Sequence, residues 1–326
     1  MQTKQDILKS FFARHRTLFA GTLVSAFVSS LLTILIPVSL GKYYELLFET
    51  SSYRSQILDF LPKVWFDQVP HYLAFFFIVV ILRGVFEYTG RFQTGKLGEI
   101  LVKNLREKLF SHQLRVSTAV YDKTGTGKYL LRFSGDLRSI QNYLTHGIIR
   151  FLSDLLLVAL AIAAMFWLSY TLALLICFNI LVSLGIVYVL NKSLYRVSVK
   201  RRNTRSGLLS FTSERLYSLL SIKAFNKEAP EGNKFKKRSV NLYRVGISFQ
   251  KIYNLISSLI PSLLYIVLGQ VLLVTYLLGS ESFQVPAGTL LSFILLLLTL
   301  LSVFRRILRV GTIWKVGNIS FSKLVD

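Results

Sequence analysis

Long intervals without a charged residue constrain the fold of this chain more than any other feature. Asp, Glu, Lys and Arg are absent from residues 17–41, 155–191, 252–280 and 282–304. A helix that crosses a bilayer needs about 20 consecutive apolar residues. The first, third and fourth intervals therefore predict one membrane span each, and the second predicts two spans joined by a tight turn at 167–171.

A further span is predicted from a shorter interval. Residues 68–82 carry no charge, and this stretch becomes long enough to cross only if it continues through Arg83 and Glu87. These two residues are four apart, so their side chains can pair on one helical face. The chain is thus predicted to be an all-α membrane protein with six spans, at about 17–41, 68–90, 148–168, 171–191, 252–279 and 284–304.

The distribution of basic residues predicts the orientation. The chain has 326 residues, 52% of them hydrophobic, and a net charge of +23. In a soluble protein this charge would indicate nucleic-acid binding, but in a membrane protein Lys and Arg collect on the cytoplasmic side. With six spans, 36 of the 39 Lys and Arg residues fall on the side that holds both termini. We therefore expect an integral plasma-membrane protein with cytoplasmic termini and no nucleic-acid partner.

The two long cytoplasmic connections are predicted to be helical. Residues 95–115 carry apolar residues at helical spacing, and residues 208–225 repeat the pattern. Each connection is interpreted as two membrane helices that run on into the cytoplasm and meet at a turn. About 30 residues of helix extend roughly 45 Å, which implies a binding partner well away from the membrane.

Several motifs together resemble a known family. They are similar in order and spacing to the transmembrane domain of type I ATP-binding-cassette (ABC) exporters, also called the type IV fold. The matching stretches are Ile81–Gly84, Leu105–Phe110, Val120–Leu130, Arg132–Asp136 and Ser213–Phe225. The resemblance covers essentially the whole chain, which is predicted to be a single domain, 1–326.

The resemblance implies partners. It implies a homodimer or heterodimer of such domains in contact with membrane lipids, and two short coupling helices, at about 117–123 and 215–225, that dock on nucleotide-binding ATPase domains. The docking residues implied are Val120, Tyr121, Asp122, Lys123, Leu219, Leu220, Ser221, Ile222, Lys223 and Phe225. Two positions depart from the family, with Val-Tyr at 120–121 instead of Phe-Phe and Leu-Ser at 220–221 instead of a glycine before the isoleucine. The alternative is that these apolar residues pack inside the hairpins.

Polar residues within or beside the spans are candidates for a substrate cavity, because charges at that depth usually face a bundle interior or water. The candidates are Arg83, Glu87, Asp154, Asn179 and Gln270. The alternatives are an ion pair within the bundle, a helix-end position for Asp154 near Arg150, and hydrogen bonds between helices for the amides.

The chain shows no catalytic site of its own. Gly90–Leu97 approaches a phosphate-binding loop but ends in Leu where Ser or Thr would bind magnesium, and it follows a predicted helix instead of a strand. The single cysteine, Cys177, excludes an internal disulfide, and the four histidines lack metal-ligand spacing. ATP and Mg²⁺ are therefore expected in a nucleotide-binding domain absent from this chain, either truncated or on a separate polypeptide.

The resulting hypothesis is the translocating part of an ATP-driven exporter that works by alternating access. Lipid, drug, peptide and glycan exporters share these motifs. One alternative is a non-transporting membrane subunit or regulator that keeps the fold. Another is a channel, which lacks support because no ring of pore-lining charges is evident.

Overall fold

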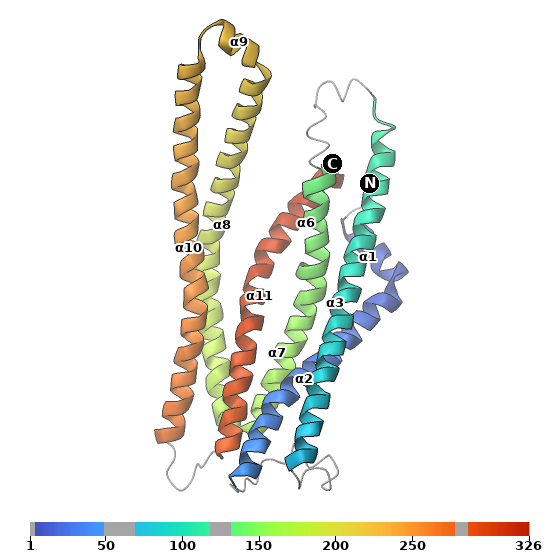
Figure 1. The fold of residues 1–326 in the computed structure, drawn as a ribbon, viewed down its shortest axis with the longest axis vertical. Helices are drawn as coiled ribbons and strands as arrows, with labels where there is room; N and C mark the ends of the chain where they lie inside the picture. The colour runs from blue at the N-terminus through green and yellow to red at the C-terminus, as the bar shows by residue number, and fades with distance from the viewer. Residues whose placement is uncertain (1–3, 49–68, 118–131, 278–285, 326) are drawn as a thin grey trace. The chain divides into compact units, whose positions relative to one another are not determined.

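The computed structural model describes residues 4–48, 69–117, 132–277 and 286–325, all essentially helical (Figure 1). The elements in order are α1 (Lys4–Arg14), α2 (Arg16–Leu47), α3 (Val69–Gln113), η3 (Arg132–Asp136), α6 (Leu137–Asn142), η4 (Tyr143–Ile149), α7 (Arg150–Leu168), α8 (Tyr170–Tyr217), α9 (Leu219–Ala224), α10 (Glu228–Leu277) and α11 (Ala287–Val325). Elements η3 and η4 are π-helical and run without a break into α6 and α7.

The six predicted spans are confirmed in the described part of the chain. Six helical segments there are long and apolar enough to cross a membrane. The predicted turn between the third and fourth spans is also confirmed, because α7 ends at Leu168 and Ser169 takes an extended conformation before α8 begins. Flanking Trp167 and Tyr170 are 54% and 64% exposed, as expected of side chains at a membrane–water interface.

Three helices are far longer than a bilayer requires. Helices α3, α8 and α10 contain 45, 48 and 50 residues. At 1.5 Å per residue each extends roughly 70 Å, about twice the thickness of the hydrocarbon core. The structure thus agrees with the prediction that spans continue as helices beyond the membrane.

The helices form two compact units. The first comprises residues 1–175 and 268–326, and the second comprises residues 176–267. In the first unit α2 packs along α3, and α11 packs against both α2 and α7.

A glycine pair lets α2 and α11 approach closely in the first unit. A Cβ atom added at Gly41 would overlap the Ser292 hydroxyl and the Gly288 carbonyl, and one added at Gly288 would overlap the Gly41 carbonyl. Small residues at such crossings allow membrane helices to gain van der Waals contact, since lipid offers no hydrophobic driving force between them.

Replacing Gly41 with alanine should therefore destabilise the first unit by about 1–3 kcal/mol, because the added methyl group meets backbone that cannot move away. The measurement is thermal unfolding in detergent. Gly84→Ala is the matched control, because a Cβ there meets nothing within 4 Å and alanine favours a helix. Equal melting temperatures for the two variants would contradict the close crossing.

The membrane-distal part of the first unit has its own apolar core. Leu97, Leu101 and Leu105, one face of α3, are at most 4% exposed. They pack with residues of α1, α6, η4 and α11, namely Phe11, Leu137, Ile140, Leu144, Ile149 and Phe321. This is the stripe predicted for residues 95–115, except that Leu114 lies beyond the end of α3 and is 72% exposed.

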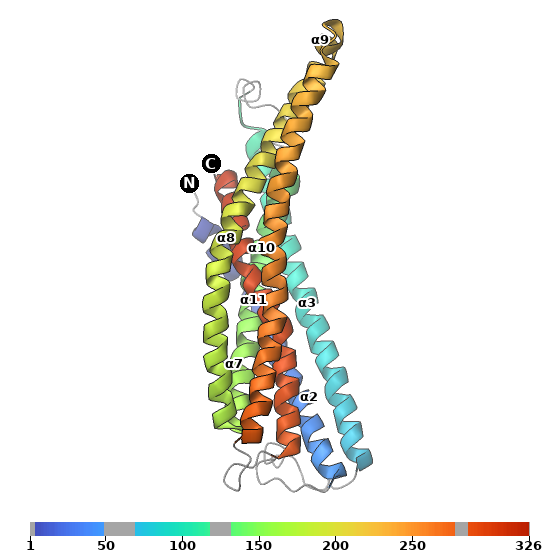
Figure 2. The same ribbon diagram turned by 90° about the vertical axis from the view of Figure 1, so that its left-hand side faces the viewer.

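The second unit is a helical hairpin of α8 and α10 closed by α9 (Figures 1 and 2). Arg215 Nε donates a hydrogen bond of 2.8 Å to Glu231 Oε2, and Lys234 Nζ lies 2.6 Å from Glu231 Oε1. The guanidinium groups of Arg215 and Arg238 both stack on the Phe211 ring, at 4.4 and 4.6 Å from its centroid. Cation–π contacts and one ion-pair cluster thus join the two arms.

The ion-pair cluster makes the hairpin sensitive to acid. The hydrogen bond from Arg215, and next that from Lys234, lowers the pKa of Glu231. A carboxylate whose pKa is lowered by folding stabilises the folded state at neutral pH and loses this contribution as the pH falls through its folded pKa. The contribution is modest, because the pair is partly exposed to solvent, with the Arg215 side chain 36% exposed.

Candidate functional site

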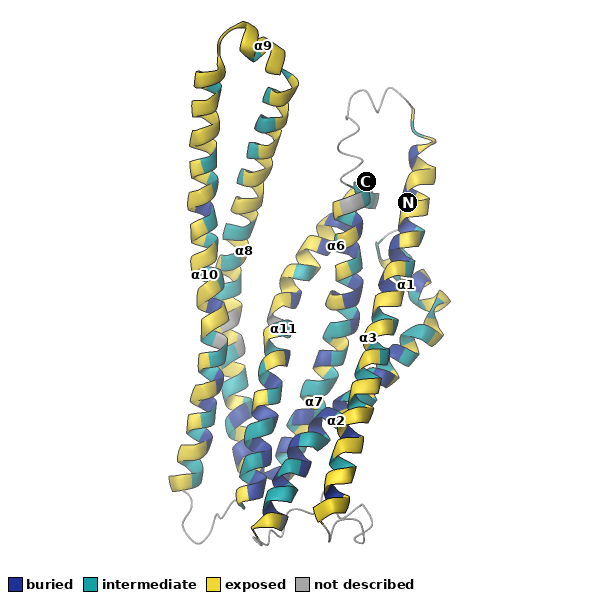
Figure 3. Cartoon of the chain, in the orientation of Figure 1, coloured by how far each residue is buried: buried dark blue, intermediate teal, exposed yellow. Residues whose placement is uncertain are grey.

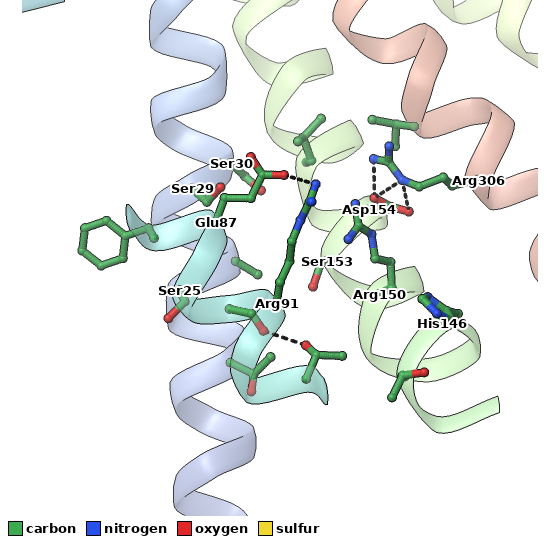
Figure 4. A pocket seen from close by; sticks show the side chains of 18 of the residues that line it. Ser25, Ser29, Ser30, Glu87, Arg91, His146, Arg150, Ser153, Asp154 and Arg306 are labelled. Carbon is green, nitrogen blue, oxygen red and sulfur yellow. Dashed lines mark hydrogen bonds and ion pairs between the residues drawn. The ribbon is translucent and has the colours of Figure 1, made fainter. Parts of the chain in front are cut away.

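A polar cavity of about 660 Å³ lies among the spans of the first unit (Figure 4). It is bounded by α2, by α3, by the continuous helix from α6 through η4 to α7, and by α11. Its walls are rich in hydroxyl and charged groups, although each of these helices is apolar enough to cross a membrane.

One wall of the cavity is a stripe of hydroxyl residues on α2. Thr22, Ser25, Ser29 and Thr33 are spaced three or four residues apart and share one face of the helix, and Ser30, next to Ser29 in the sequence, also lines the cavity. The Thr22 and Thr33 hydroxyls donate to carbonyls one turn earlier, at Leu18 and Ser29. Such bonds satisfy the hydroxyl hydrogen in an apolar helix and leave the oxygen able to accept a hydrogen bond.

Three charged residues at four-residue spacing line the α3 side. Glu87 lies between Arg83 and Arg91 and pairs with both, with Arg83 Nη2 at 3.4 Å from Glu87 Oε2. Arg83 Nε also donates a 2.9 Å hydrogen bond to Thr33 Oγ1, so that this charge cluster is tied to α2. The predicted Arg83–Glu87 pair is confirmed, and Arg91 extends it by one turn.

A second ion pair joins α7 to α11. Arg306 Nη2 is 2.7 Å from Asp154 Oδ1 and Arg306 Nε is 3.0 Å from Asp154 Oδ2. The guanidinium thus donates hydrogen bonds to both carboxylate oxygens. Asp154 is only 4% exposed, and a buried charge needs such a partner. The partner lies on another helix, so Asp154 takes part in an ion pair within the bundle, which was one of the alternatives to substrate contact.

The remaining basic groups of the cavity lie along the continuous helix. Arg138, His146 and Arg150 line it from α6, η4 and α7. In the residues that the structure describes, neither Arg138 nor Arg150 makes an ion pair, whereas the other three arginines of the cavity do.

The π-helical stretch η4 positions this side of the cavity. Insertion of extra residues into a helix shifts its hydrogen-bond ladder, and such stretches often occur at functional sites. The Gly147 carbonyl of η4 accepts a 2.6 Å hydrogen bond from Trp314 Nε1 of α11. A Cβ at Gly98 of α3 would overlap Thr145, so that α3 lies directly against η4.

The five candidate cavity residues divide into two groups. Arg83, Glu87 and Asp154 line the same cavity, brought together from α3 and α7. Asn179 lies on α8 in the second unit and Gln270 on α10, and neither lines it. The sequence interpretation missed Arg91, Arg150 and Arg306. Arg91 is one turn from Glu87 and Arg150 is one turn from Asp154, so helical spacing would have indicated both. No local pattern in the sequence indicates Arg306.

The second predicted coupling segment forms a distinct short helix, α9. It runs from Leu219 to Ala224, so the predicted start at 215 is four residues too early. Asn226, with φ of 48°, ends it, while Asn226 N–H and Lys227 N–H donate to the carbonyls of Lys223 and Ile222. This is the Schellman arrangement that terminates helices.

Most of helix α9 is exposed to solvent (Figure 3). Leu219, Leu220 and Phe225 are 45%, 85% and 73% exposed, with Ser221 and Lys223 also exposed and Ile222 half-buried. Leu219, Leu220 and Phe225 therefore do not pack inside the hairpin, contrary to the alternative interpretation. The other predicted docking residues, Val120, Tyr121, Asp122 and Lys123, lie outside the described residues.

Within the described ranges, no three His, Cys, Asp or Glu side chains gather closely enough to hold a metal ion.

Comparison with known proteins identifies the fold. The profile of the ABC transporter transmembrane region matches residues 19–304. An ATP-dependent lipid A-core flippase of Desulfotalea psychrophila is 24% identical over 277 residues, which cover 82% of this chain and 47% of the relative. An uncharacterized ABC transporter ATP-binding protein of Bacillus subtilis is 33% identical over 41% of this chain and 22% of its own length. A putative multidrug export ATP-binding/permease protein of Staphylococcus aureus is 23% identical over 54% of this chain and 31% of its own length. The matched part of this chain thus spans less than half of each relative.

Proposed function

The chain belongs to the family of ABC transporter transmembrane regions, and we propose that it forms the substrate-translocating membrane half of an ATP-driven exporter. The observation that carries this proposal is the charged and hydroxyl-rich cavity among four of its spans. Ionisable groups at membrane depth are costly and usually mark a substrate path. The names of two relatives, a lipid A-core flippase and a multidrug export protein, describe functions of the same kind.

The proposed mechanism is alternating access. Its physical requirement is that ATP stabilises one of two packings of the helices more than the other. The cavity offers charge pairs that such a repacking could exchange, since Asp154 and Arg306 lie on different helices and Arg150 is one turn from Asp154. An exchange of partners would keep the buried Asp154 carboxylate paired with an arginine in both states.

The free energy for transport is proposed to come from a nucleotide-binding ATPase domain that binds ATP and Mg²⁺. The relatives include ATP-binding/permease proteins. Exposed apolar side chains on α9, at the tip of a long helical hairpin, supply a surface for that domain. The stretch 117–123 is proposed as the other contact. A second transmembrane domain, identical or homologous, would complete the substrate path.

We propose that the protein lies in the plasma membrane. Both termini and both long connections would then face the cytoplasm. We expect cysteines introduced at Ser52 and Gly232, in a Cys177→Ser background, to differ in labelling by a membrane-impermeant maleimide. Ser52 should react in intact cells, and Gly232 only after permeabilisation. Equal labelling of both positions in intact cells would refute the six-span topology.

The transport proposal is tested by reconstitution. The protein is purified from its native membrane, its partners and full length are identified by mass spectrometry, and the complex is placed in liposomes. ATP-dependent accumulation of a fluorescent lipid or drug would support the proposal. A native product without any ATPase, and without ATP-dependent transport, would favour the alternative of a non-transporting subunit.

A further inference from the structure

The crossing of α2 and α11 lies beyond one end of the cavity, at the lower ends of both helices in Figure 1. Gly41 is eight residues beyond Thr33, and Gly288 is eleven residues before Thr299, the nearest residues of each helix that line the cavity. At 1.5 Å per residue the crossing is roughly 12–16 Å from the cavity. In the proposed orientation this end faces the outside, so a change that weakens the crossing favours outward opening.

A carboxyl group is buried in this crossing. Glu45, one turn after Gly41, is 6% exposed. Its side chain packs on Gly288, where an added Cβ atom would overlap Glu45 Cγ and Oε1. Glu45 Oε2 is buried and has no hydrogen-bond partner among the described residues, whereas the equally buried Asp154 is bonded to Arg306. An ionised carboxylate buried without such a partner is so costly that the group takes up a proton instead.

The titratable groups around Glu45 do not supply that partner. Lys42, on the same helix, lies within electrostatic range but donates no hydrogen bond to Oε2. Tyr72 of α3 is 1% exposed, and its hydroxyl donates to the Ser39 carbonyl. His71, which precedes Tyr72, is exposed. Helix α11 has no Asp, Glu, His, Lys, Arg or Tyr between residues 287 and 304.

We infer that Glu45 is a proton-binding site at the outer end of the spans. Its carboxyl group holds a proton while α2 and α11 are packed together, and it releases this proton to water when the crossing separates. A neutral carboxylic acid can donate a hydrogen bond, and the Gly41 carbonyl oxygen lies beside the same position of Gly288 as Glu45 Oε1. The inference rests on the proposed orientation and on alternating access.

The direction of the pH dependence follows from this linkage. Because separation releases a proton, the separated state becomes more favourable as the pH rises. For one proton, the ratio of separated to packed molecules changes by up to about tenfold per pH unit. Acid conditions outside the cell should therefore hold the crossing together, and alkaline conditions should favour outward opening.

The test measures the distance between the two helix ends. Spin labels are attached to Leu47→Cys and Ala287→Cys in a Cys177→Ser background, because Leu47 and Ala287 are exposed at this end of α2 and α11. Pulsed electron paramagnetic resonance then gives the distance distribution of the purified protein in an uncharged detergent. Between about pH 5.5 and about pH 8.5, we expect the ratio of long to short distances to rise at least about tenfold.

Two variants show whether this response belongs to Glu45. Glu45→Gln, a neutral side chain of the same shape, should keep the short distance at both pH values. His71→Gln is the matched control, because it removes a neighbouring group that titrates near neutral pH and should leave the response unchanged. Should Glu45→Gln fail to fold, Glu45→Met removes the ionisable group at similar volume.

Three outcomes would overturn the inference. A distance distribution that does not depend on pH, or a Glu45→Gln variant that still follows the pH, would show that no proton on Glu45 controls the crossing. Separation in acid instead of alkali would mean that Glu45 is ionised in the packed state, with Lys42 as its counter-ion. The assay contains neither ATP nor substrate, so a negative result leaves the transport proposal standing, and failure of reconstituted transport leaves this response measurable.

Discussion

Replacing Leu220 and Phe225 together with alanine should abolish most ATP-driven transport while the membrane bundle stays folded. The two side chains are 85% and 73% exposed on and beside α9, so their loss removes little packing within the chain. Buried aromatic and aliphatic anchors at protein interfaces typically contribute about 2 kcal/mol or more each. Loss of both should therefore weaken binding of the ATPase domain by roughly 700-fold.

The measurements are transport in liposomes and affinity for the ATPase domain. The double variant Leu209→Ala and Tyr243→Ala is the matched control, because these side chains are 60% and 67% exposed on the arms of the same hairpin. Melting temperatures of both variants should equal that of the unmodified protein. Unchanged ATPase affinity in the α9 variant would exclude this helix as the docking site.

The features that sequence analysis predicted correctly are those set by local pattern. Charge-free runs define the spans, because a charge inside an apolar helix is costly wherever the helix packs. The pair of Arg83 and Glu87 follows from a four-residue spacing, which any helix brings together. The turn at Ser169 follows from the bilayer thickness and from the interfacial residues around it.

The features that it missed depend on tertiary packing. Asp154 and Arg306 are separated by 152 positions, and the sequence offers Arg150 one turn from Asp154 as an equally good local partner. Only the packing of α11 against α7 decides between them. Gln270, another candidate, lies on α10 and does not line this cavity, which is built from other helices.

The start of α9 was misplaced for a related reason. Residues 215–225 continue a helical apolar pattern, and nothing in it marks a break at Ser218. The structure shows that Arg215 belongs to the end of α8, where it binds Glu231 across the hairpin. Arg215 thus lies in the range predicted for the second coupling helix but contributes to closing the hairpin.

The largest loss of stability is expected on removing one member of the Asp154–Arg306 pair. Deleting one partner of a fully buried pair typically costs about 3–5 kcal/mol, because the other charge is left uncompensated. The Asp154 side chain is 6% exposed but that of Arg306 is 36% exposed, and solvent screens the latter. We therefore expect Asp154→Ala to cost about 2–3 kcal/mol.

The design is a double-mutant cycle with Asp154→Ala, Arg306→Ala and the double variant, followed by unfolding in a graded mixture of detergents. The double variant should be more stable than the sum of the single effects predicts, since it leaves no unpaired charge from this pair in the bundle. Glu87→Ala is the matched control, because that carboxylate is 31% exposed and pairs along its own helix, where a pair contributes about 0.2–0.5 kcal/mol. If Asp154→Ala costs no more than Glu87→Ala, the pair does not hold α7 to α11. The exchange of partners proposed for alternating access would then lose its basis, because a contact that stabilises neither packing cannot favour one of them.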